Sequence, residues 1–475
     1  MALAGYLLSI DPDRFGKLNR DLAARMANSG GEPLVPTSST RAFVSLDVLK
    51  ALHAAMGRDK LDKVLRKAGA VWDSPVDDQL ATALLRTRDA NDLPPREDRE
   101  QAPEVDSHSG ELLDWHLVEA NIDGAWAAFG GRDRIEWGNV TLGHIDTGFT
   151  RHPVLGFKKG TGTSAWVDTV RDRNFFSKEI GDVGEATSVA TMFASLDDAE
   201  DKLGGFSGGH GTRTSSVLCG FDTGASAKRA AAAGREYAGY FGAAPKVPVV
   251  PIRVEDSIWL QAELGAGLPD SIDYLVESAG VRVITLSMGA PRTLLTGTDA
   301  PQRLKDSLRN AYLRGVIVVC AAGNHFPDEQ VLFPARLVYT IAVGGTAPGH
   351  LPWSGSSYGV QVDVSAPAYP IRRATTQRGG KYIYGVGEGT SYAAPLVAGT
   401  AALWLAHHGG AIDAQYPARW QRVAAFRSLL KSTALVPPNG WPTSTRGAAI
   451  LDAGKLLEAA LPEAGTLVPE VPDSS

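Results

Sequence analysis

The sequence predicts an α/β protein, a three-layer sandwich with a central, mainly parallel sheet, plus a smaller, partly helical N-terminal domain. The chain has 475 residues, 44% of them hydrophobic and 21% charged, which suits one large globular domain with an appendage. From about residue 111, short β-branched runs alternate with helical patterns. These runs are apolar at nearly every position, which is typical of parallel strands buried on both faces.

The predicted strands and helices follow one another along the chain. The strand candidates are residues 140–146, 247–254, 281–289, 315–323 and 338–345. Helical periodicity predicts helices over residues 268–280 and 301–315. Residues 390–407 are apolar on nearly all sides, as expected for a helix through the middle of a core, and Pro395 is tolerated in its first turn.

The remaining segments set the domain boundaries. Residues 1–92 are predicted to form a separate domain, with helical periodicity over residues 45–57 and 58–70. Residues 93–110 are rich in charge and proline and are predicted to be an exposed linker. The large domain is then expected to span residues 111–460, followed by a flexible tail over residues 461–475.

Charge and cysteine content exclude several classes of protein. The net charge of −6 provides no basic field for nucleic acid or for an anionic membrane surface, and no uninterrupted apolar run is long enough to span a bilayer. The N-terminal apolar stretch lacks a preceding basic residue and a convincing cleavage site, which argues against a secretory signal. Two cysteines, Cys219 and Cys320, cannot form a disulfide framework, so we expect free thiols and a cytoplasmic location.

Four short stretches place reactive residues at strand ends or helix starts. Asp146 ends the predicted strand 140–146, and Asn324 follows the strand 315–323. His210 lies among glycines before a helical pattern, and Ser391 begins the apolar helix. Each residue alone has an ordinary structural explanation, such as a turn or a helix cap. Together they supply a nucleophile, a base, an orienting acid and an oxyanion donor, which are the requirements of acyl transfer.

The wider context of these residues resembles the subtilisin family of serine proteases (subtilases, peptidase S8 type) over residues 111 to about 460. The motifs "DTG" at Asp146, "HGTxxS" at His210, "AAGN" at Asn324 and "GTSYAAP" at Ser391 occur in the order of that family. Accompanying segments also match: "HPVL" at 152–155, "LSMG" at 286–289, "FPA" at 333–335 and "VDVSAPA" at 362–368. The resemblance implies a subtilisin-like sandwich fold and a serine endopeptidase.

The resemblance also implies a role for each site residue. Ser391 would attack the peptide carbonyl, His210 would transfer the proton, Asp146 would orient His210, and Asn324 would donate to the oxyanion. Ser287, Met288 and Gly289 would pair with the substrate backbone and form one wall of the primary pocket. Ala321, Ala322 and Gly323 would form the opposite wall. Small residues on these walls predict room for a medium or large apolar side chain.

Cofactors, partners and alternatives complete the expectations. No cofactor is required for this chemistry. The family allows structural calcium, but the acidic stretch between Asp146 and His210 has no recognisable ligand spacing. The expected partner is a protein or peptide substrate, and the N-terminal domain is expected either to inhibit the active site or to recruit a partner. A catalytically silent subtilase-fold scaffold is the alternative. An α/β-hydrolase-type esterase fits less well, because Ser391 lacks the G-x-S-x-G context.

Overall fold

The computed structural model of the chain forms two compact units, one comprising residues 1–93 and 202–208, the other residues 94–201 and 209–475. The linker predicted over residues 93–110 lies outside the described residues. In the first unit the structure describes residues 3–9, 35–38, 41–45, 58–67 and 71–77, with isolated positions besides. In the second it describes residues 114–158, 162–176, 199–201, 209–222, 240–255, 267–290, 302–324, 331–376, 382–437 and 449–470, with isolated positions besides.

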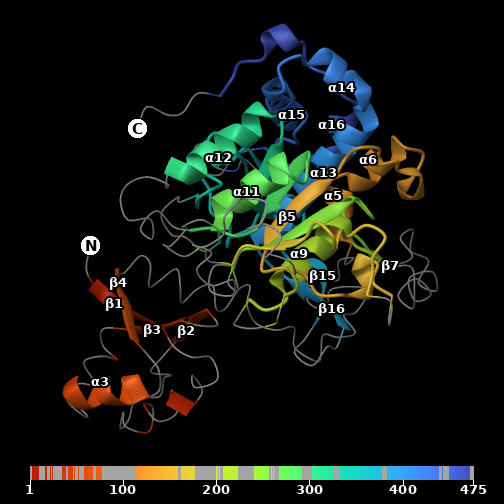
Figure 1. Ribbon diagram of the computed structural model, residues 1–475. Helices are drawn as coiled ribbons and strands as arrows, with labels where there is room; N and C mark the ends of the chain where they lie inside the picture. Colours follow the sequence, from red (N-terminus) through yellow and green to blue (C-terminus); the bar gives the residue numbers. More distant parts are fainter. Residues whose placement is uncertain are drawn as a thin grey trace. The chain divides into compact units, whose positions relative to one another are not determined.

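The second unit is built around a mainly parallel sheet (Figure 1). Within the described residues eight strands join in the order β13-β12-β11-β10-β5-β9-β6, with β14 also paired to β12. All pairs are parallel except β12 with β13. The strands are β5 (Leu142–Asp146), β6 (Arg173–Asn174), β9 (Val249–Arg253), β10 (Val283–Leu286), β11 (Ile317–Ala321), β12 (Ile341–Ala347), β13 (Leu351–Pro352) and β14 (Val364–Pro367).

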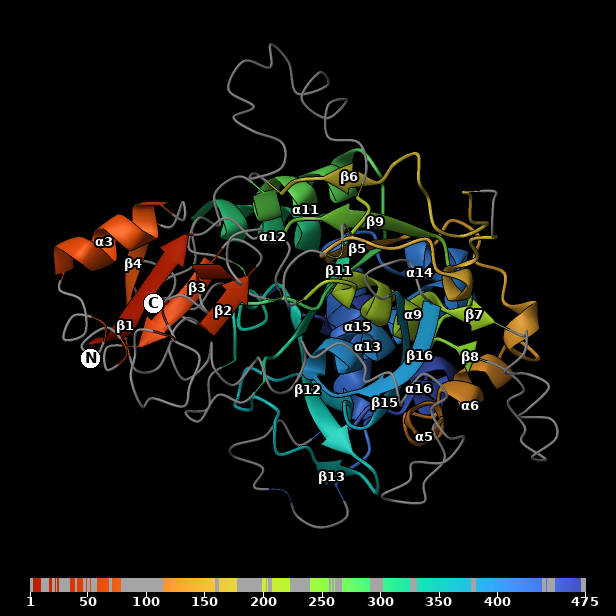
Figure 2. The ribbon, with the colours of Figure 1, turned by 90° about the horizontal axis from the view of Figure 1, so that it is seen from below.

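Helices cover both faces of this sheet (Figure 2). Helices α11 (Gly267–Glu277) and α12 (Gln302–Leu313) lie on one face, and α9 (His210–Cys219) and α13 (Thr390–His408) lie on the other. Strand β5 shows the division, because a side chain at Gly143 would meet Leu275 of α11, whereas His144 bonds Thr214 of α9. All five β5 residues are buried, as near-continuous apolar strands predict. The predicted α/β sandwich is therefore confirmed.

Helix α13 runs through the core as predicted. Its residues from Thr390 to Leu405 are all buried. A Cβ atom at Gly399 would lie 2.7 Å from the Cβ of Ala243, so a glycine permits close packing there. The helix starts at the site residues and ends at the surface. The close packing along its buried length holds its first turn in place.

Smaller elements surround this core. They are the hairpins β7 (Phe221–Asp222)–β8 (Tyr240–Phe241) and β15 (Ile371–Thr376)–β16 (Tyr382–Gly387), and the helices α5 (Trp115–Glu119), α6 (Ile122–Ala127), α14 (Gly410–Gln415), α15 (Trp420–Ser432) and α16 (Ala453–Glu458).

The C-terminal segment differs from the predicted flexible tail. Residues 461–470 pack against the large unit, while residues 471–475 lie outside the described residues. The backbone N–H of Glu470 donates to the Tyr312 hydroxyl at 2.9 Å, and its carboxylate pairs with Arg427. The Tyr416 hydroxyl donates to Pro462 at 2.9 Å. These long-range contacts hold a segment whose own sequence has no periodic pattern.

The N-terminal unit contains a sheet that the sequence analysis missed. Its described strands pair antiparallel in the order β2-β3-β1-β4, and helix α3 (Arg58–Lys67) matches the second predicted helix. The strands are β1 (Leu3–Ser9), β2 (Val35–Ser38), β3 (Arg41–Ser45) and β4 (Val71–Asp77). Ser45, predicted to cap the first helix, ends β3 instead, and most of residues 46–57 lie outside the described residues. The unit is thus partly helical, but it also contains a sheet.

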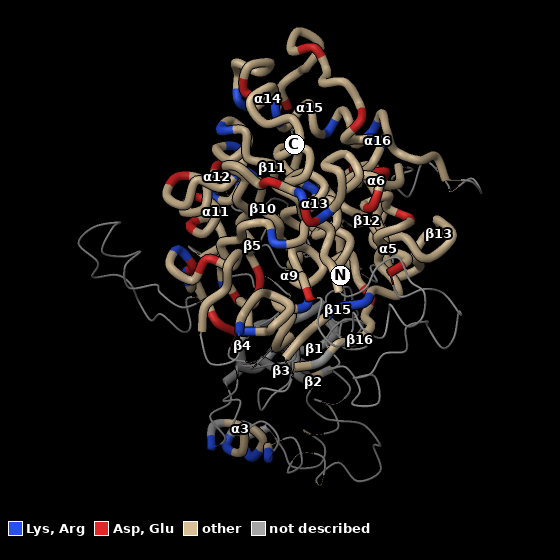
Figure 3. The backbone as a smooth tube through the Cα atoms, turned by 90° about the vertical axis from the view of Figure 1, so that its right-hand side faces the viewer, with Lys and Arg blue, Asp and Glu red and all other residues tan. Residues whose placement is uncertain are grey.

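Charged residues and thiols are distributed as in an ordinary globular protein. In the view of Figure 3, acidic and basic residues are interspersed along the large unit. No helix in the described part of the chain is long and apolar enough to cross a membrane. Cys219 ends α9 and Cys320 lies in β11, and both thiols are free and buried. Burial raises the pKa of Cys219 to about 12 and also raises the pKa of Cys320.

Candidate active site

Asp146 and His210 form a buried hydrogen-bonded pair where β5 ends and α9 begins. His210 Nδ1 lies 2.7 Å from Asp146 Oδ1, and both side chains are fully buried. The same carboxylate oxygen accepts the Thr147 backbone N–H at 2.7 Å, and Oδ2 accepts the Thr214 hydroxyl at 3.2 Å. The carboxylate therefore has donors on both oxygens and directs one of them at the imidazole.

The environment favours the ionised form of Asp146. Burial opposes ionisation, but the His210 charge and hydrogen bond and the Thr147 N–H outweigh it, so the pKa of Asp146 is lowered from its ordinary value. An ionised carboxylate at Nδ1 fixes the imidazole tautomer with its proton on Nδ1. The other ring nitrogen, Nε2, is then the atom free to accept a proton.

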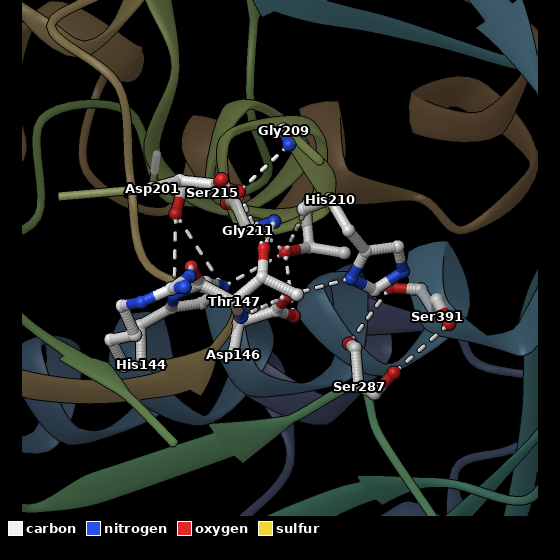
Figure 4. Close-up of polar contacts among 12 residues, drawn as sticks. His144, Asp146, Thr147, Asp201, Gly209, His210, Gly211, Ser215, Ser287 and Ser391 are labelled. Carbon is white, nitrogen blue, oxygen red and sulfur yellow. Dashed lines mark hydrogen bonds and ion pairs between the residues drawn. The ribbon is translucent and has the colours of Figure 1, made fainter. Parts of the chain in front are cut away.

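Ser391 lies on the other side of the imidazole, as Figure 4 shows. Nε2 of His210 is buried and has no hydrogen-bond partner among the described residues. The Ser391 hydroxyl instead donates to the Ser287 carbonyl at 3.1 Å, and the Ser287 hydroxyl donates to the Ser391 carbonyl at 2.9 Å. The Ser391 side chain thus occupies a rotamer turned toward Ser287, and rotation about χ1 would redirect it.

The first turn of α13 is fixed by Asn324, which follows β11. The Asn324 Oδ1 atom accepts both the backbone N–H and the hydroxyl of Thr390, each at 2.9 Å. The Thr390 hydroxyl in turn accepts the Gly323 N–H at 3.1 Å. Because both Thr390 donors occupy Oδ1, the amide hydrogens of Asn324 point elsewhere. Gly389, just before the helix, has φ of 145°, a value that side-chain-bearing residues rarely adopt.

The predicted pocket walls contain a residue that the sequence analysis missed, Leu332. A Cβ atom on Gly289 would lie 2.8 Å from Leu332 Cδ1, and one on Gly323 would lie 2.6 Å from Leu332 Cγ. Leu332 therefore contacts both walls, and its N–H donates to the Ala322 carbonyl at 2.9 Å. A signal for it existed in the sequence, because residues 331 and 332 directly precede the "FPA" segment.

The backbone of Gly289 is already hydrogen bonded. Its N–H donates to the Ile258 carbonyl at 3.1 Å, and its carbonyl accepts the Leu260 N–H at 3.0 Å. The neighbouring Ala290 exchanges two 2.9 Å hydrogen bonds with Phe333. A substrate backbone that pairs with Gly289, as expected from the sequence, would compete with residues 258 and 260 for these groups.

A polar cluster behind Asp146 was also missed. His144, two residues before Asp146 on the same face of β5, is buried, and its Nε2 lies 2.9 Å from the Thr214 hydroxyl. Burial lowers the pKa of His144 to about 4, while the Asp146 charge raises it and the His210 charge lowers it. Alternation along the strand could have identified His144, because positions 142, 144 and 146 share one face.

The carboxylates near the site that the structure describes bind protein donors. Within the ranges that the structure describes, no three His, Cys, Asp or Glu side chains are grouped so as to bind a metal ion. Asp201, the last residue of the acidic stretch, instead accepts the Thr147 hydroxyl and the Gly209 N–H, each at 2.7 Å. The described carboxylates near the site thus act as hydrogen-bond acceptors for the protein itself.

Comparison with known proteins identifies the family. The sequence profile of the Subtilase family matches residues 138–455, about two thirds of the chain. The chain belongs to the subtilase family. An extracellular protease of Xanthomonas campestris pv. campestris is 28% identical over 72% of this subtilase and 54% of its own length. Subtilisin NAT of Bacillus subtilis subsp. natto is 34% identical over 40% of this chain and 46% of its own length.

A solved structure supports the fold. Its subject is a protease from Pseudoalteromonas arctica PAMC 21717, with a TM-score of 0.51 and 22% identity over 73% of this chain and 96% of that one. This subtilase spans about half the length of the curated relatives it matches.

The comparison overturns the predicted cytoplasmic location. The relative that aligns with 72% of this subtilase is an extracellular protease, and this finding argues against the predicted location. The prediction rested on the first residues of the chain and on free thiols. Buried thiols are compatible with either environment, because a thiol without access to oxidants or partner thiols stays reduced.

Proposed function

We propose that this subtilase is a serine endopeptidase in which Asp146, His210 and Ser391 form the catalytic triad. The observation that carries the proposal is the buried 2.7 Å bond between Asp146 and His210, with the unpartnered Nε2 on the Ser391 side of the ring. A base needs one nitrogen oriented by an acid and the other available to the nucleophile. This arrangement meets both requirements.

The reaction begins with rotation of the Ser391 hydroxyl from the Ser287 carbonyl toward His210 Nε2. His210 then accepts the hydroxyl proton as Oγ attacks the peptide carbonyl, and Asp146 stabilises the resulting imidazolium. His210 returns the proton to the leaving amine, and a water molecule hydrolyses the acyl-enzyme by the same route in reverse. Rotamer exchange is fast compared with such chemistry, so the resting rotamer does not limit turnover.

The oxyanion has two donors in this proposal. They are the backbone N–H of Ser391, in the first turn of α13, and the Nδ2 amide of Asn324, whose Oδ1 is held by Thr390. A helix N-terminus also favours negative charge through its aligned peptide dipoles. Donors that are fixed before the reaction need no reorganisation when the charge develops.

The substrate is a protein or peptide, and we infer a preference for a small side chain before the scissile bond. Leu332 lies against both Gly289 and Gly323 and occupies space that the small residues on the two walls would otherwise leave open. This replaces the earlier expectation of a medium or large apolar side chain. Backbone pairing at Gly289 requires the substrate to displace the contacts from residues 258 and 260.

Truncating Leu332 tests this preference. Leu332→Ala is expected to raise kcat/KM for a peptide with Phe before the scissile bond at least about tenfold relative to one with Ala, since each added buried methylene contributes roughly 0.8 kcal/mol. Leu337→Ala, a nearby and partly buried leucine, serves as the control and should leave the ratio unchanged. An unchanged ratio in Leu332→Ala would remove Leu332 from the substrate site.

The N-terminal unit is proposed to restrain the enzyme or to recruit a partner. Its described residues form a small antiparallel sheet with one helix, so the unit has a compact fold of its own that could serve either role. A propeptide would be cut by the enzyme itself, whereas a recruiting domain would be retained. The two roles therefore differ in the mass of the mature protein.

Replacing the nucleophile tests the function and the processing together. Ser391→Ala is expected to lower kcat on the order of 10⁶-fold, the size known for subtilisin, and to abolish labelling by a fluorophosphonate probe. The matched control is Ser271→Ala, which removes a fully buried serine hydroxyl from α11, on the opposite face of the sheet. Normal casein hydrolysis by folded Ser391→Ala would rule out the mechanism.

The same variants discriminate the alternatives. A silent scaffold would show neither labelling nor casein cleavage in the wild type, and an esterase would cleave simple esters alone. Intact masses of wild type and Ser391→Ala, purified in parallel, report on the N-terminal unit. A shorter wild-type chain alone indicates self-processing, and equal full-length masses contradict it.

A further inference from the structure

The polar cluster behind Asp146 has no role in the proposed reaction. Strand β5 is otherwise apolar up to Asp146, yet it places His144 in the core on the same face as the carboxylate. Helix α9 adds two hydroxyl residues opposite it, Thr214 and Ser215, both buried. A histidine and two hydroxyls in a core require hydrogen-bond partners, because an unsatisfied buried polar group is costly.

The contacts form a chain that ends at the carboxylate. His144 Nε2 lies 2.9 Å from Thr214 Oγ1, and Thr214 Oγ1 lies 3.2 Å from Asp146 Oδ2. The Thr214 hydroxyl has a single proton, and it also lies 3.2 Å from the carbonyls of His210 and Gly211. With its proton on Nε2, His144 would donate a hydrogen bond to the Thr214 hydroxyl. The hydroxyl proton would then be available for a hydrogen bond to Asp146. The Ser215 hydroxyl lies 3.4 Å from both ring nitrogens, close enough to serve Nδ1.

Burial favours the neutral form of His144, because it lowers the pKa of the imidazole. Asp146 and His210 are the titratable groups whose charges act on it, and they act in opposite directions. From the flanking strands its register neighbours are Thr285 of β10 and Pro251 of β9, neither of which carries a charge. A neutral imidazole can hold one proton on Nε2 as a permanent donor.

We propose that His144 is a positioning residue that, through the Thr214 hydroxyl, fixes the Asp146 carboxylate from the side opposite to His210. The proposal rests on the assignment of Asp146 and His210 to the triad. His210 holds Oδ1 and the relay holds Oδ2, so the carboxylate plane cannot turn away from the imidazole. His144 does not touch the substrate, and it acts only through the orientation of Asp146.

Two variants break the relay in the full-length protein. Thr214→Val removes the hydroxyl and keeps the shape, and His144→Val removes the donor. Each is expected to lower kcat about tenfold with KM changed less than about twofold, because poor orientation is felt in the transition state. The double variant should lose no more than either single variant, since both interrupt one chain. A merely structural role would not produce this non-additivity in kcat.

Rescue and control variants complete the test. His144→Gln keeps an amide donor at a similar reach and should retain kcat within about threefold of wild type. Thr285→Val is the matched control and should leave kcat unchanged, because it removes a buried hydroxyl on the strand beside His144 that has no hydrogen-bond partner among the described residues. All rates are referred to active sites titrated with a fluorophosphonate.

The outcomes separate this proposal from the proposed function. Wild-type kcat in Thr214→Val, additive losses in the double variant, or equal losses in His144→Gln and His144→Val would each overturn the relay. If His144→Val fails to fold, the kcat values of Thr214→Val and His144→Gln decide whether the relay exists. An inactive wild type that does not react with fluorophosphonate would instead contradict the triad itself.

Discussion

The two helices that begin at the active site are capped by side chains of different charge. At α9 the Asp201 carboxylate accepts the Gly209 N–H at 2.7 Å, one residue before His210. At α13 the Asn324 amide oxygen accepts the Thr390 N–H at 2.9 Å, one residue before Ser391. Both caps come from loops outside their helices, and both satisfy a backbone donor that a helix leaves free. One cap is an anion and the other is neutral.

The difference matches the charge that develops at each end during the proposed reaction. His210 becomes positive, so an anion at the start of α9 is favourable. The oxyanion forms at the start of α13, where a carboxylate would repel it. Glu388, two residues before Thr390, fits this pattern, because burial raises the pKa of its carboxyl group. The pKa of Asp146, at the α9 end, is lowered instead.

Exchanging the amide cap for a carboxylate should have the largest effect. Asn324→Asp keeps an acceptor for Thr390 but loses the amide donor and adds a negative charge. Loss of the donor alone costs about 10²–10³-fold in kcat in subtilisin, and repulsion should add at least about another tenfold. Asn324→Ala measures the donor alone. An aspartate variant as active as the alanine variant would break the charge comparison.

The stability of the folded protein should depend on pH through His144, which packs against α9. Its pKa in the folded protein is about 4 against 6.5 as the ordinary value, so the unfolded chain binds a proton that the folded chain rejects. Stability is then complete above about pH 6.5 and is lost as the pH falls toward 4, by about 3 kcal/mol in total. Denaturant unfolding at several pH values should show this slope.

His144→Gln removes this titrating group and should make the curve less steep between pH 6.5 and 4.5, whereas Thr285→Val should keep the wild-type slope. Asp146 also has a lowered pKa, so its contribution is lost only below the ordinary range of an aspartate and does not interfere in this interval. A slope that is identical in wild type and His144→Gln would show that His144 is not protonated on unfolding.

The smallest effect is expected from neutralising the α9 cap. Asp201→Asn can still accept the Gly209 N–H and the Thr147 hydroxyl, so it removes charge while keeping a cap. A single charge outside the triad, partly screened, should change kcat only about threefold. The comparison would be reversed if Asp201→Asn lost more activity than Asn324→Asp.

Local sequence predicted the elements whose signal is contained in one segment. The runs ending at Asp146 and preceding Asn324 became β5 and β11, and the apolar helix at Ser391 became α13. Motif order indicated that these residues belong to one site. Their relative geometry, such as the turned rotamer of Ser391, depends on Ser287, which lies 104 residues away. No local sequence pattern could predict a contact between residues so far apart in the chain.

The missed features all depend on contacts between distant segments. Leu332 became important because Gly289 and Gly323 approach it from two different strand ends. In the sequence His144 stands as a single polar residue within a strand pattern, because its partner Thr214 lies 70 residues later. The sheet of the N-terminal unit pairs Leu3–Ser9 with Val71–Asp77, and neither strand alternates clearly enough to stand out from the helical segment between them.

The buried thiols give the molecule two internal reporters of opening. Alkylating reagents react with the thiolate form of cysteine. In the folded chain burial shields Cys219 and Cys320 from the reagent, and their raised pKa lowers the fraction of thiolate. Their rates of modification therefore measure how often each surrounding region opens. Cys219 ends the helix that carries His210, and Cys320 lies in β11 of the central sheet, four residues before Asn324. Mass spectrometry of the two alkylated peptides would rank the local stability of these regions without introducing any new cysteine.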